Sequence, residues 1–178
     1  MKTYLAILRG INVSGTKLIK MTDLQSLSES IGLKTVRTYI QSGNVIFEAE
    51  KDDNLAKKIE QKILEKYQFE VPVLVKTMED MEKLIKENPF IKDETVDIQK
   101  LHVTFMENDP DNNPLDKIKG LEFGKDHYYI TGKSIYLYCP DGYGRTKLNN
   151  NFFESKLKVR CTTRNWKTVN EIMKIMKA

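Results

Sequence analysis

Cysteine and histidine are scarce in this sequence of 178 residues, which holds only Cys139, Cys161, His102 and His127. Zinc sites draw their ligands mainly from these two residue types at characteristic spacings, and no such spacing occurs here. The two cysteines suit a reducing cytoplasm in which both thiols are free. We therefore predict no metal site and no tightly held cofactor.

Long hydrophobic runs are also missing. No apolar stretch approaches the roughly 20 residues that a membrane-spanning helix requires. Residues 1–10 contain a single Lys before the chain turns polar, which does not fit a secretory signal peptide. We expect a cytoplasmic protein without a membrane contact.

Neither sign of charge dominates the chain. The 29 Lys and Arg residues exceed the 25 Asp and Glu residues by a net charge of +4, and the two signs interleave along the sequence. Such a pattern is typical of a solvated surface. A polyanion partner is compatible with it only if folding gathers several bases on one face.

The catalytic signatures that can be recognised by spacing are absent. The sequence has no serine elbow, no HExxH, no paired-acid signature and no cysteine with an evident histidine partner. His102 lies in an alternating strand pattern that favours a structural role, and both cysteines are expected in the core. The sequence therefore predicts no reaction.

The first half of the chain has the element order β, α, β, β, α, β. Strands are expected at 3–8, 35–40, 45–48 and 71–75, and helices at 22–31 and 55–67. Thr22 is the expected cap of the first helix, with Gln25 three residues later. Pro72 cannot donate to a strand ladder, so the fourth strand is expected at a sheet edge. This order is that of ferredoxin-like folds, whose first and third strands are central.

The second half predicts a similar order, although no residue-level repeat is visible. After a helix capped by Thr77 that ends near Pro89, the expected elements are strands at 101–106, 127–131, 134–139 and 159–161, and helices at 115–118, 149–158 and 164–176. We predict an α+β fold with a ferredoxin-like subdomain at 1–77, a connecting helix and linker at 78–99, and a related second subdomain at 100–178. The second subdomain carries an extra C-terminal helix and is expected to share a core with the first.

Residues 41–44 form a polar corner between two strands. A tight hairpin turn explains Gly43 and Asn44, because these residues tolerate positive φ. It does not explain Gln41 or Ser42, so a ligand or the other half of the protein is a second possible reason for this corner.

Two later segments could attract anions. If the last helix begins within Cys161–Trp166 with a threonine cap, its free N–H groups favour negative charge, and Arg164 in the first turn costs about 0.3–1 kcal/mol unless an acidic side chain or an anionic ligand lies beside it. The loop 141–147 carries Arg145 and Lys147 among glycines. It resembles a phosphate cradle only loosely, and an ordinary glycine-rich turn explains it as well.

Three segments together resemble one protein family. They are residues 8–13 (Leu-Arg-Gly-Ile-Asn-Val), 38–47 (with Tyr-Ile-Gln-Ser-Gly-Asn-Val at its centre) and 162–166 (Thr-Thr-Arg-Asn-Trp). In this order and spacing the chain resembles the bacterial family catalogued as domain of unknown function 1697. Thr146 stands where the family usually has serine, and Ser14 where it more often has glycine. The resemblance implies a two-part α+β fold of ferredoxin-like character and supplies no activity.

These observations lead to one site hypothesis with alternatives. We expect the polar segments to converge on a cleft between the two halves that binds a phosphate-bearing ligand, either a nucleotide or a nucleic acid. The expected ligand-binding residues are Arg9, Asn12, Gln41, Ser42, Asn44, Arg145, Lys147, Thr163, Arg164 and Asn165. The alternatives are an enzyme that acts on a small anionic metabolite and a structural or partner-binding protein whose polar segments only lock the halves together.

Overall fold

The computed structural model describes residues 1–178 and divides into two compact units. Unit 1 comprises residues 1–82 with 172–178, and unit 2 comprises residues 83–171. The division falls inside helix α3 (Met78–Lys86) and again inside helix α6 (Trp166–Lys177). The sequence-based boundaries lie at 77 and 100 and keep the last helix in one half, whereas the end of α6 groups with unit 1.

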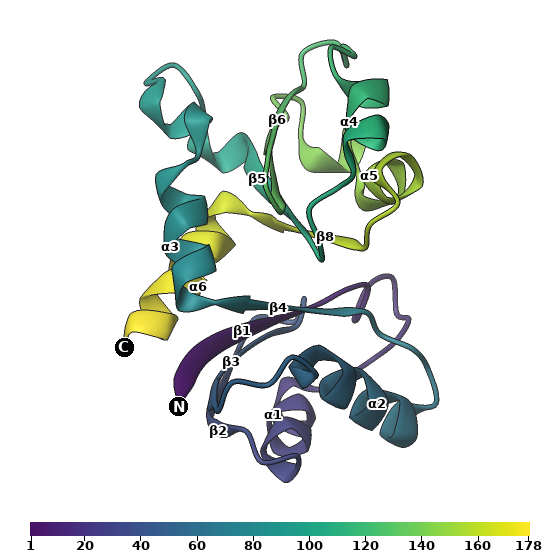
Figure 1. The fold of residues 1–178 in the computed structure, drawn as a ribbon, viewed down its shortest axis with the longest axis vertical. Helices are drawn as coiled ribbons and strands as arrows, with labels where there is room; N and C mark the ends of the chain where they lie inside the picture. The colour runs from purple at the N-terminus through teal and green to yellow at the C-terminus, as the bar shows by residue number, and fades with distance from the viewer. The chain divides into compact units, whose positions relative to one another are not determined.

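Unit 1 has one antiparallel sheet with two helices on one of its faces (Figure 1). Its elements are β1 (Lys2–Leu8), α1 (Met21–Ser30), β2 (Lys34–Tyr39), β3 (Asn44–Ala49), α2 (Leu55–Tyr67) and β4 (Val73–Thr77). The sheet order β2-β3-β1-β4 places β1 and β3 at the centre and β4 at an edge, as predicted. Pro72 lies just before β4, where its missing N–H costs no ladder hydrogen bond.

Unit 2 repeats this connectivity. Its elements are the 3₁₀ turns η1 (Pro89–Lys92), η2 (Ile98–Lys100) and η3 (Tyr143–Arg145), the strands β5 (Leu101–Met106), β6 (His127–Thr131), β7 (Ser134–Tyr138) and β8 (Cys161–Asn165), and the helices α4 (Asn112–Ile118) and α5 (Asn150–Leu157). The sheet order β6-β7-β5-β8 matches that of unit 1 strand for strand. The predicted α+β class with two related halves is confirmed.

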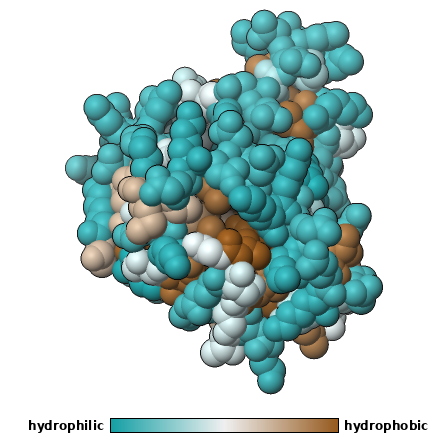
Figure 2. Space-filling view, turned by 60° about the horizontal axis from the view of Figure 1, so that its bottom comes forward, coloured by the Kyte–Doolittle hydropathy of each residue, from teal (hydrophilic) through white to brown (hydrophobic).

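Each sheet packs its helices against an apolar face. In unit 1, Tyr4, Ala6 and Leu8 of β1 join a buried cluster with side chains of both helices, such as Leu24 and Ile59. The alternate β1 side chains are fully buried on the other face, which explains why the first strand is apolar at nearly every position. Figure 2 shows one face of the protein, on which hydrophilic side chains dominate and hydrophobic ones surface in smaller areas.

The start of the last helix differs from the prediction. Residues 161–165, expected largely as helix start, form strand β8, which pairs antiparallel with β5. β-branched Thr162 and Thr163 favour the strand, and the Thr163 hydroxyl lies 2.7 Å from the Thr104 hydroxyl across the ladder. The helix begins at Trp166, and its cap is Asn165, whose Oδ1 accepts from Thr168 N at 2.7 Å, and not a threonine.

Of the caps predicted at Thr22 and Thr77, the first is wrong and the second is confirmed. Helix α1 begins after Lys20 without a side-chain cap, and Thr22 lies inside its first turn, so the capping box expected there is wrong. Thr77 does cap α3. Asp80 N donates to Thr77 Oγ1 at 3.1 Å and Thr77 N donates to Asp80 Oδ2 at 2.9 Å, a reciprocal pair.

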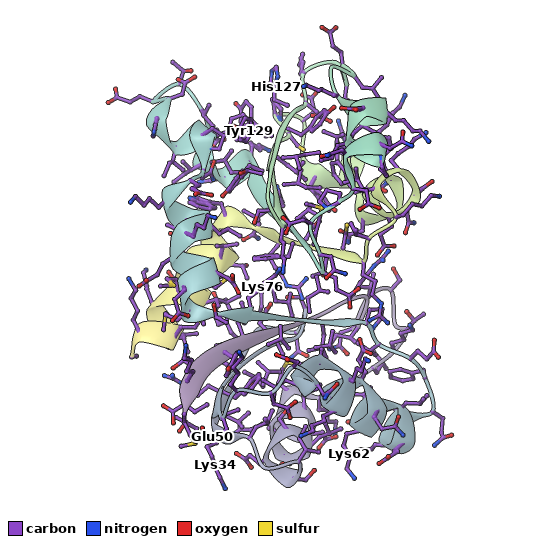
Figure 3. All side chains as sticks on the ribbon, viewed as in Figure 1. Lys34, Glu50, Lys62, Lys76, His127 and Tyr129 are labelled. Atoms are coloured by element: carbon purple, nitrogen blue, oxygen red, sulfur yellow. The ribbon has the colours of Figure 1, made fainter.

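The two halves also have residues of the same kinds at the last three positions of their fourth strands. In unit 1, Val75, Lys76 and Thr77 end the fourth strand, with Lys76 opposite Leu5 of the first strand. In unit 2, Thr163, Arg164 and Asn165 occupy the same register, with Arg164 opposite Val103. Each half therefore has a β-branched residue, a buried cation and a helix cap in succession. Figure 3 labels Lys76 on the face of β4 that points away from α1 and α2.

The caps predict a measurable difference in stability. We expect Thr77→Ala and Asn165→Ala each to lower the free energy of unfolding by about 1 kcal/mol, because each leaves a helix N–H without its side-chain acceptor. Thr22→Ala should change it by less than about 0.5 kcal/mol, since Thr22 caps nothing. Urea unfolding followed by circular dichroism measures all three, and a loss at Thr22 equal to that at Thr77 would contradict the assignment.

Candidate functional site

A cavity of about 630 Å³ lies in unit 1 at the start of α1. Its walls are formed by residues 18–23, by Asn12 from the loop after β1, by Gln41 from the hairpin corner and by Tyr67 at the end of α2. The cavity thus brings together two segments that the sequence marks as site candidates. Its size is within the roughly 300–1,000 Å³ that is usual for small-molecule sites.

Asn12 holds the loop after β1 against the hairpin corner. Its Nδ2 donates to the Gln41 carbonyl oxygen at 2.8 Å and to the Ile19 carbonyl oxygen at 3.0 Å, and its Oδ1 accepts from Ile19 N at 2.9 Å. Its φ of 55° is a left-handed conformation that asparagine tolerates well. Asn12 therefore positions the cavity wall, while Gln41 presents an exposed side chain.

The cavity combines hydrogen-bond donors with one carboxylate. No side chain caps the start of α1, and Lys20 is its N-cap residue. The N–H groups of the first turn have no partner within the helix and carry its positive dipole end. Asp23 lies in the same turn and accepts from the Tyr67 hydroxyl at 3.4 Å. Burial and the charge of Asp23 raise the pKa of Tyr67, which keeps its hydroxyl protonated.

The hairpin corner is tightly built. Asn44 is fully buried, and its Nδ2 donates to the Tyr39 carbonyl oxygen at 2.9 Å and to Ser42 Oγ at 3.2 Å. Gly43 has a φ of 84°, and a Cβ at this position would come within 2.6 Å of Ile11 Cδ1. Glycine is therefore required by close packing as well as by turn geometry. Next to the corner, Arg9 is half-buried and its backbone N donates to the Pro72 carbonyl oxygen at 3.0 Å.

The predicted residues of β8 have contacts within unit 2. The buried Arg164 guanidinium donates from Nη1 to Thr162 Oγ1 at 3.0 Å and to the Thr163 carbonyl oxygen at 2.9 Å. Burial lowers the pKa of Arg164 to about 10, an effect partly opposed by nearby Tyr143. The Thr163 hydroxyl contacts Asn150 Oδ1 as well as Thr104, each at 2.7 Å.

The loop 141–147 is anchored by a threonine. Thr146 Oγ1 donates to Asp126 Oδ2 at 2.6 Å and accepts from Leu148 N at 3.1 Å. These bonds need only a hydroxyl, so threonine serves where serine is usual. Arg145 and Lys147 on either side of it are exposed.

The ten predicted site residues are thus divided between the two units. In unit 1 the structure places Asn12 and Gln41 on one cavity, with Ser42 and Asn44 beside them in the corner. Arg145, Lys147, Thr163, Arg164 and Asn165 belong to unit 2. Their convergence on a single cleft stays a prediction.

The remaining polar groups of the cavity, above all Lys20 and Asp23, were not predicted as site residues. The sequence contained no signal for them, because Thr22 suggested a capped helix start, and the missing cap is visible only in the structure. No group of three or more His, Cys, Asp or Glu side chains is arranged to hold a metal ion. None of the helices has the length and apolar character that crossing a membrane demands.

Comparison with known proteins identifies the family. A family model described as "Protein of unknown function (DUF1697)" matches residues 1–136. The chain belongs to this family. No curated protein matches the sequence. The DUF1697 match contains the polar segments at 8–13 and 38–47, whereas the loop 141–147 and the segment at 162–166 lie beyond its end.

A solved structure supports the fold of this DUF1697 chain. It is "The structure of conserved bacterial protein SP0830 from Streptococcus pneumoniae", with 24% sequence identity and a TM-score of 0.78. The alignment covers 98% of each chain. The likeness therefore extends through both halves, and at this identity it concerns the fold alone.

A partly buried histidine predicts a pH dependence of stability. The His102 ring stacks on Tyr143 at 4.7 Å between ring centres, and burial lowers the pKa of His102. Between its ordinary pKa, about 6.5, and the lower folded one, the unfolded chain binds more protons, so stability falls as the pH falls through this window. His102→Gln should show a shallower loss of unfolding free energy between about pH 7 and 5 than the parent.

The control for this measurement is His127→Gln, because His127 is exposed. Urea midpoints at half-unit pH steps give the three profiles. An unchanged profile in His102→Gln would show that burial of His102 does not affect the acid stability.

Proposed function

We propose that this protein binds a phosphate-bearing small ligand, in the first instance a nucleotide, in the unit 1 cavity at the start of α1. The observation that carries the proposal is a helix start without a side-chain cap that opens into a cavity of nucleotide size. Helix N-termini bind phosphate because their free N–H groups and their dipole favour negative charge. The Lys20 ammonium adds a full positive charge at the same place.

The other cavity residues suit the remaining parts of a nucleotide. The Asp23 carboxylate can accept hydrogen bonds from ribose hydroxyls, and the Gln41 amide can pair with a base edge. Leu18, which is 63% exposed, and the Tyr67 ring provide apolar surface for a base. A nucleic acid could use the same cavity through one unstacked nucleotide.

Asp23 also sets the expected specificity. A carboxylate in the first turn repels free phosphate, while it attracts a ligand that brings hydroxyl groups. Inorganic phosphate should therefore bind more weakly than a nucleotide. The protonated Tyr67 hydroxyl is a donor and not a base, so the alternative of an enzyme acting on an anionic metabolite gains no support here.

We also propose that the protein works in the cytoplasm. Cys139 and Cys161 are buried and form no disulfide, and burial raises the pKa of the Cys139 thiol to about 11. Such thiols are inert core groups, compatible with a reducing compartment.

Titration calorimetry at low salt tests the nucleotide proposal. We expect adenosine and guanosine monophosphates to release heat and inorganic phosphate to release much less. Lys20→Ala should weaken binding by about 10-fold or more, because it removes a charge-assisted hydrogen bond of about 1.5–3 kcal/mol. Gln41→Ala should alter the preference among bases.

Lys34→Ala is the matched control, because Lys34 is exposed at the end of β2 opposite to the corner. Arg145→Ala in the same titration tests whether a predicted unit 2 residue takes part. The proposal fails if no nucleotide gives heat, or if Lys20→Ala binds like the parent.

A structural role for part of the predicted set is the second candidate. Its support is the burial of Asn44 and Arg164 and their bonds to backbone carbonyl oxygens. Asn44→Ala should lower the free energy of unfolding by about 1–3 kcal/mol, because the Tyr39 carbonyl oxygen loses its donor. The melting temperature of Asn44→Ala should fall by the same amount with and without nucleotide, and that of Gln41→Ala should stay close to the value of the parent protein. An Asn44→Ala variant with the melting temperature of the parent would contradict this structural role.

A further inference from the structure

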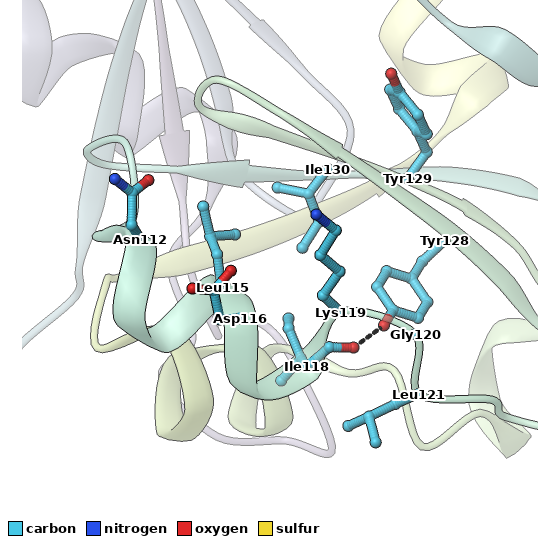
Figure 4. A pocket seen from close by; sticks show the side chains of 10 residues that line it. All are labelled: Asn112, Leu115, Asp116, Ile118, Lys119, Gly120, Leu121, Tyr128, Tyr129 and Ile130. Atoms are coloured by element: carbon cyan, nitrogen blue, oxygen red, sulfur yellow. Dashed lines mark hydrogen bonds between the residues drawn. The ribbon is translucent and has the colours of Figure 1, made fainter.

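A second cavity, of about 700 Å³, lies in unit 2 between α4 and strand β6 (Figure 4). Leu115 and Ile118 of α4 and Ile130 of β6 form its apolar walls, and residues 119–121 close one end. The Tyr128 hydroxyl donates to the Ile118 carbonyl oxygen and holds this end in place. The cavity has no residue in common with the unit 1 site.

The opening between α4 and β6 is not imposed by the topology. In unit 1 the equivalent helix, α1, packs closely on the equivalent strand, β2. In unit 2, α4 packs instead on α5. The same fold therefore closes this groove in one half and leaves it open in the other.

The outer side of the groove is a free sheet edge. Strand β6 is the last strand of its sheet and pairs only with β7, through a two-residue turn at Gly132 and Lys133. In such a hairpin the closing pair, Thr131 with Ser134, exchanges hydrogen bonds, and so does every second pair beyond it. The backbone N–H and C=O groups of Tyr128 and Ile130 consequently point away from β7 and are available to another strand.

Two opposite charges line the groove without forming an ion pair with each other. Asp116 and Lys119 are three residues apart at the end of α4, both are exposed, and no salt bridge joins them. On the other face of β6, Tyr129 is 53% exposed (Figure 3). The groove therefore offers one negative partner, one positive partner and an apolar centre, beside a backbone edge.

We propose that an extended peptide segment of a partner protein binds here by adding a fifth strand next to β6. Only a polypeptide matches the alternating backbone donors and acceptors of the edge. Side chains of a strand alternate between its faces, so every second residue of the segment meets the groove. The complementary segment has a basic residue, an apolar residue and an acidic residue at alternate positions, for Asp116, the apolar walls and Lys119, respectively.

NMR titration of the full ¹⁵N-labelled chain with acetyl-Lys-Thr-Leu-Thr-Glu-amide tests the proposal. We expect the largest shifts at the amides of Tyr128 and Ile130, with slowed hydrogen exchange at both. A peptide with Asp in place of Leu should bind at least about 10-fold more weakly, because it would bury a charge in the apolar centre. An analogue with N-methylated threonines and leucine should lose binding to a similar degree, because it cannot complete the ladder.

Protein variants give the matched controls. Lys119→Met retains the apolar stem and removes the charge, so it should weaken binding by about 3-fold or more. Lys117→Met changes the same residue type on α4 outside the groove and should bind like the parent. The proposal is overturned if the Tyr128 and Ile130 amides do not shift, or if the N-methylated peptide binds as well as the parent peptide. Displacement of the peptide by hexanoate together with equal binding of the N-methylated peptide would assign the groove to small apolar acids instead.

Discussion

The antiparallel pairing of the first strand of each half with two neighbours constrains the rest of the molecule. Strand β1 lies between β3 and β4, and β5 lies between β7 and β8. A strand with partners on both sides and apolar contacts on both faces cannot slip, because a shift of one residue would exchange its faces. The loop after β1, the 41–44 corner and the start of β4 are consequently held at one end of the sheet. There the Leu8 and Arg9 backbone amides reach Gly43 and Pro72.

Much of this architecture could be predicted, because buried positions are apolar and recur along the sequence with the period of the strand or helix. The uninterrupted apolar run in β1 indicated a central strand, and Pro72 indicated an edge. The secondary structure of residues 161–165 was harder to predict, because Thr, Arg and Asn before an apolar helical pattern are compatible with a helix cap as well as with a strand. The ladder with β5 decides in favour of the strand, and such a long-range pairing has no local signal. Leu64 similarly follows the apolar spacing of α2 but is 38% exposed. The residues packed against a helix decide how many of its apolar side chains are buried, and the sequence of the helix alone does not show this.

The candidate site was predictable only in part, for a related reason. Polar residues at strand ends, such as Asn12 and Gln41, stand out because a turn does not require them. Lys20 and Asp23 looked like ordinary surface charges, since the sequence suggested a capped helix at Thr22. In the structure that cap is absent, and Lys20 and Asp23 line the same cavity. Chemistry that depends on a missing hydrogen bond becomes visible only when the positions of the atoms are known.

The buried cations show how register determines the environment of a charge. Lys76 and Arg164 precede the caps of α3 and α6, where the helix dipole disfavours positive charge. On the sequence-based prediction, Arg164 lies in the first turn of a helix and requires an acidic side chain or an anion beside it. In the strand its guanidinium donates to two oxygens of its own segment, the Thr162 hydroxyl and the Thr163 carbonyl oxygen. Hydrogen bonds of this kind offset part of the cost of burying a cation. The basic residue before α6 is thus buried and hydrogen-bonded within unit 2, whereas the exposed Lys20 before α1 lies next to an uncapped helix start and a cavity.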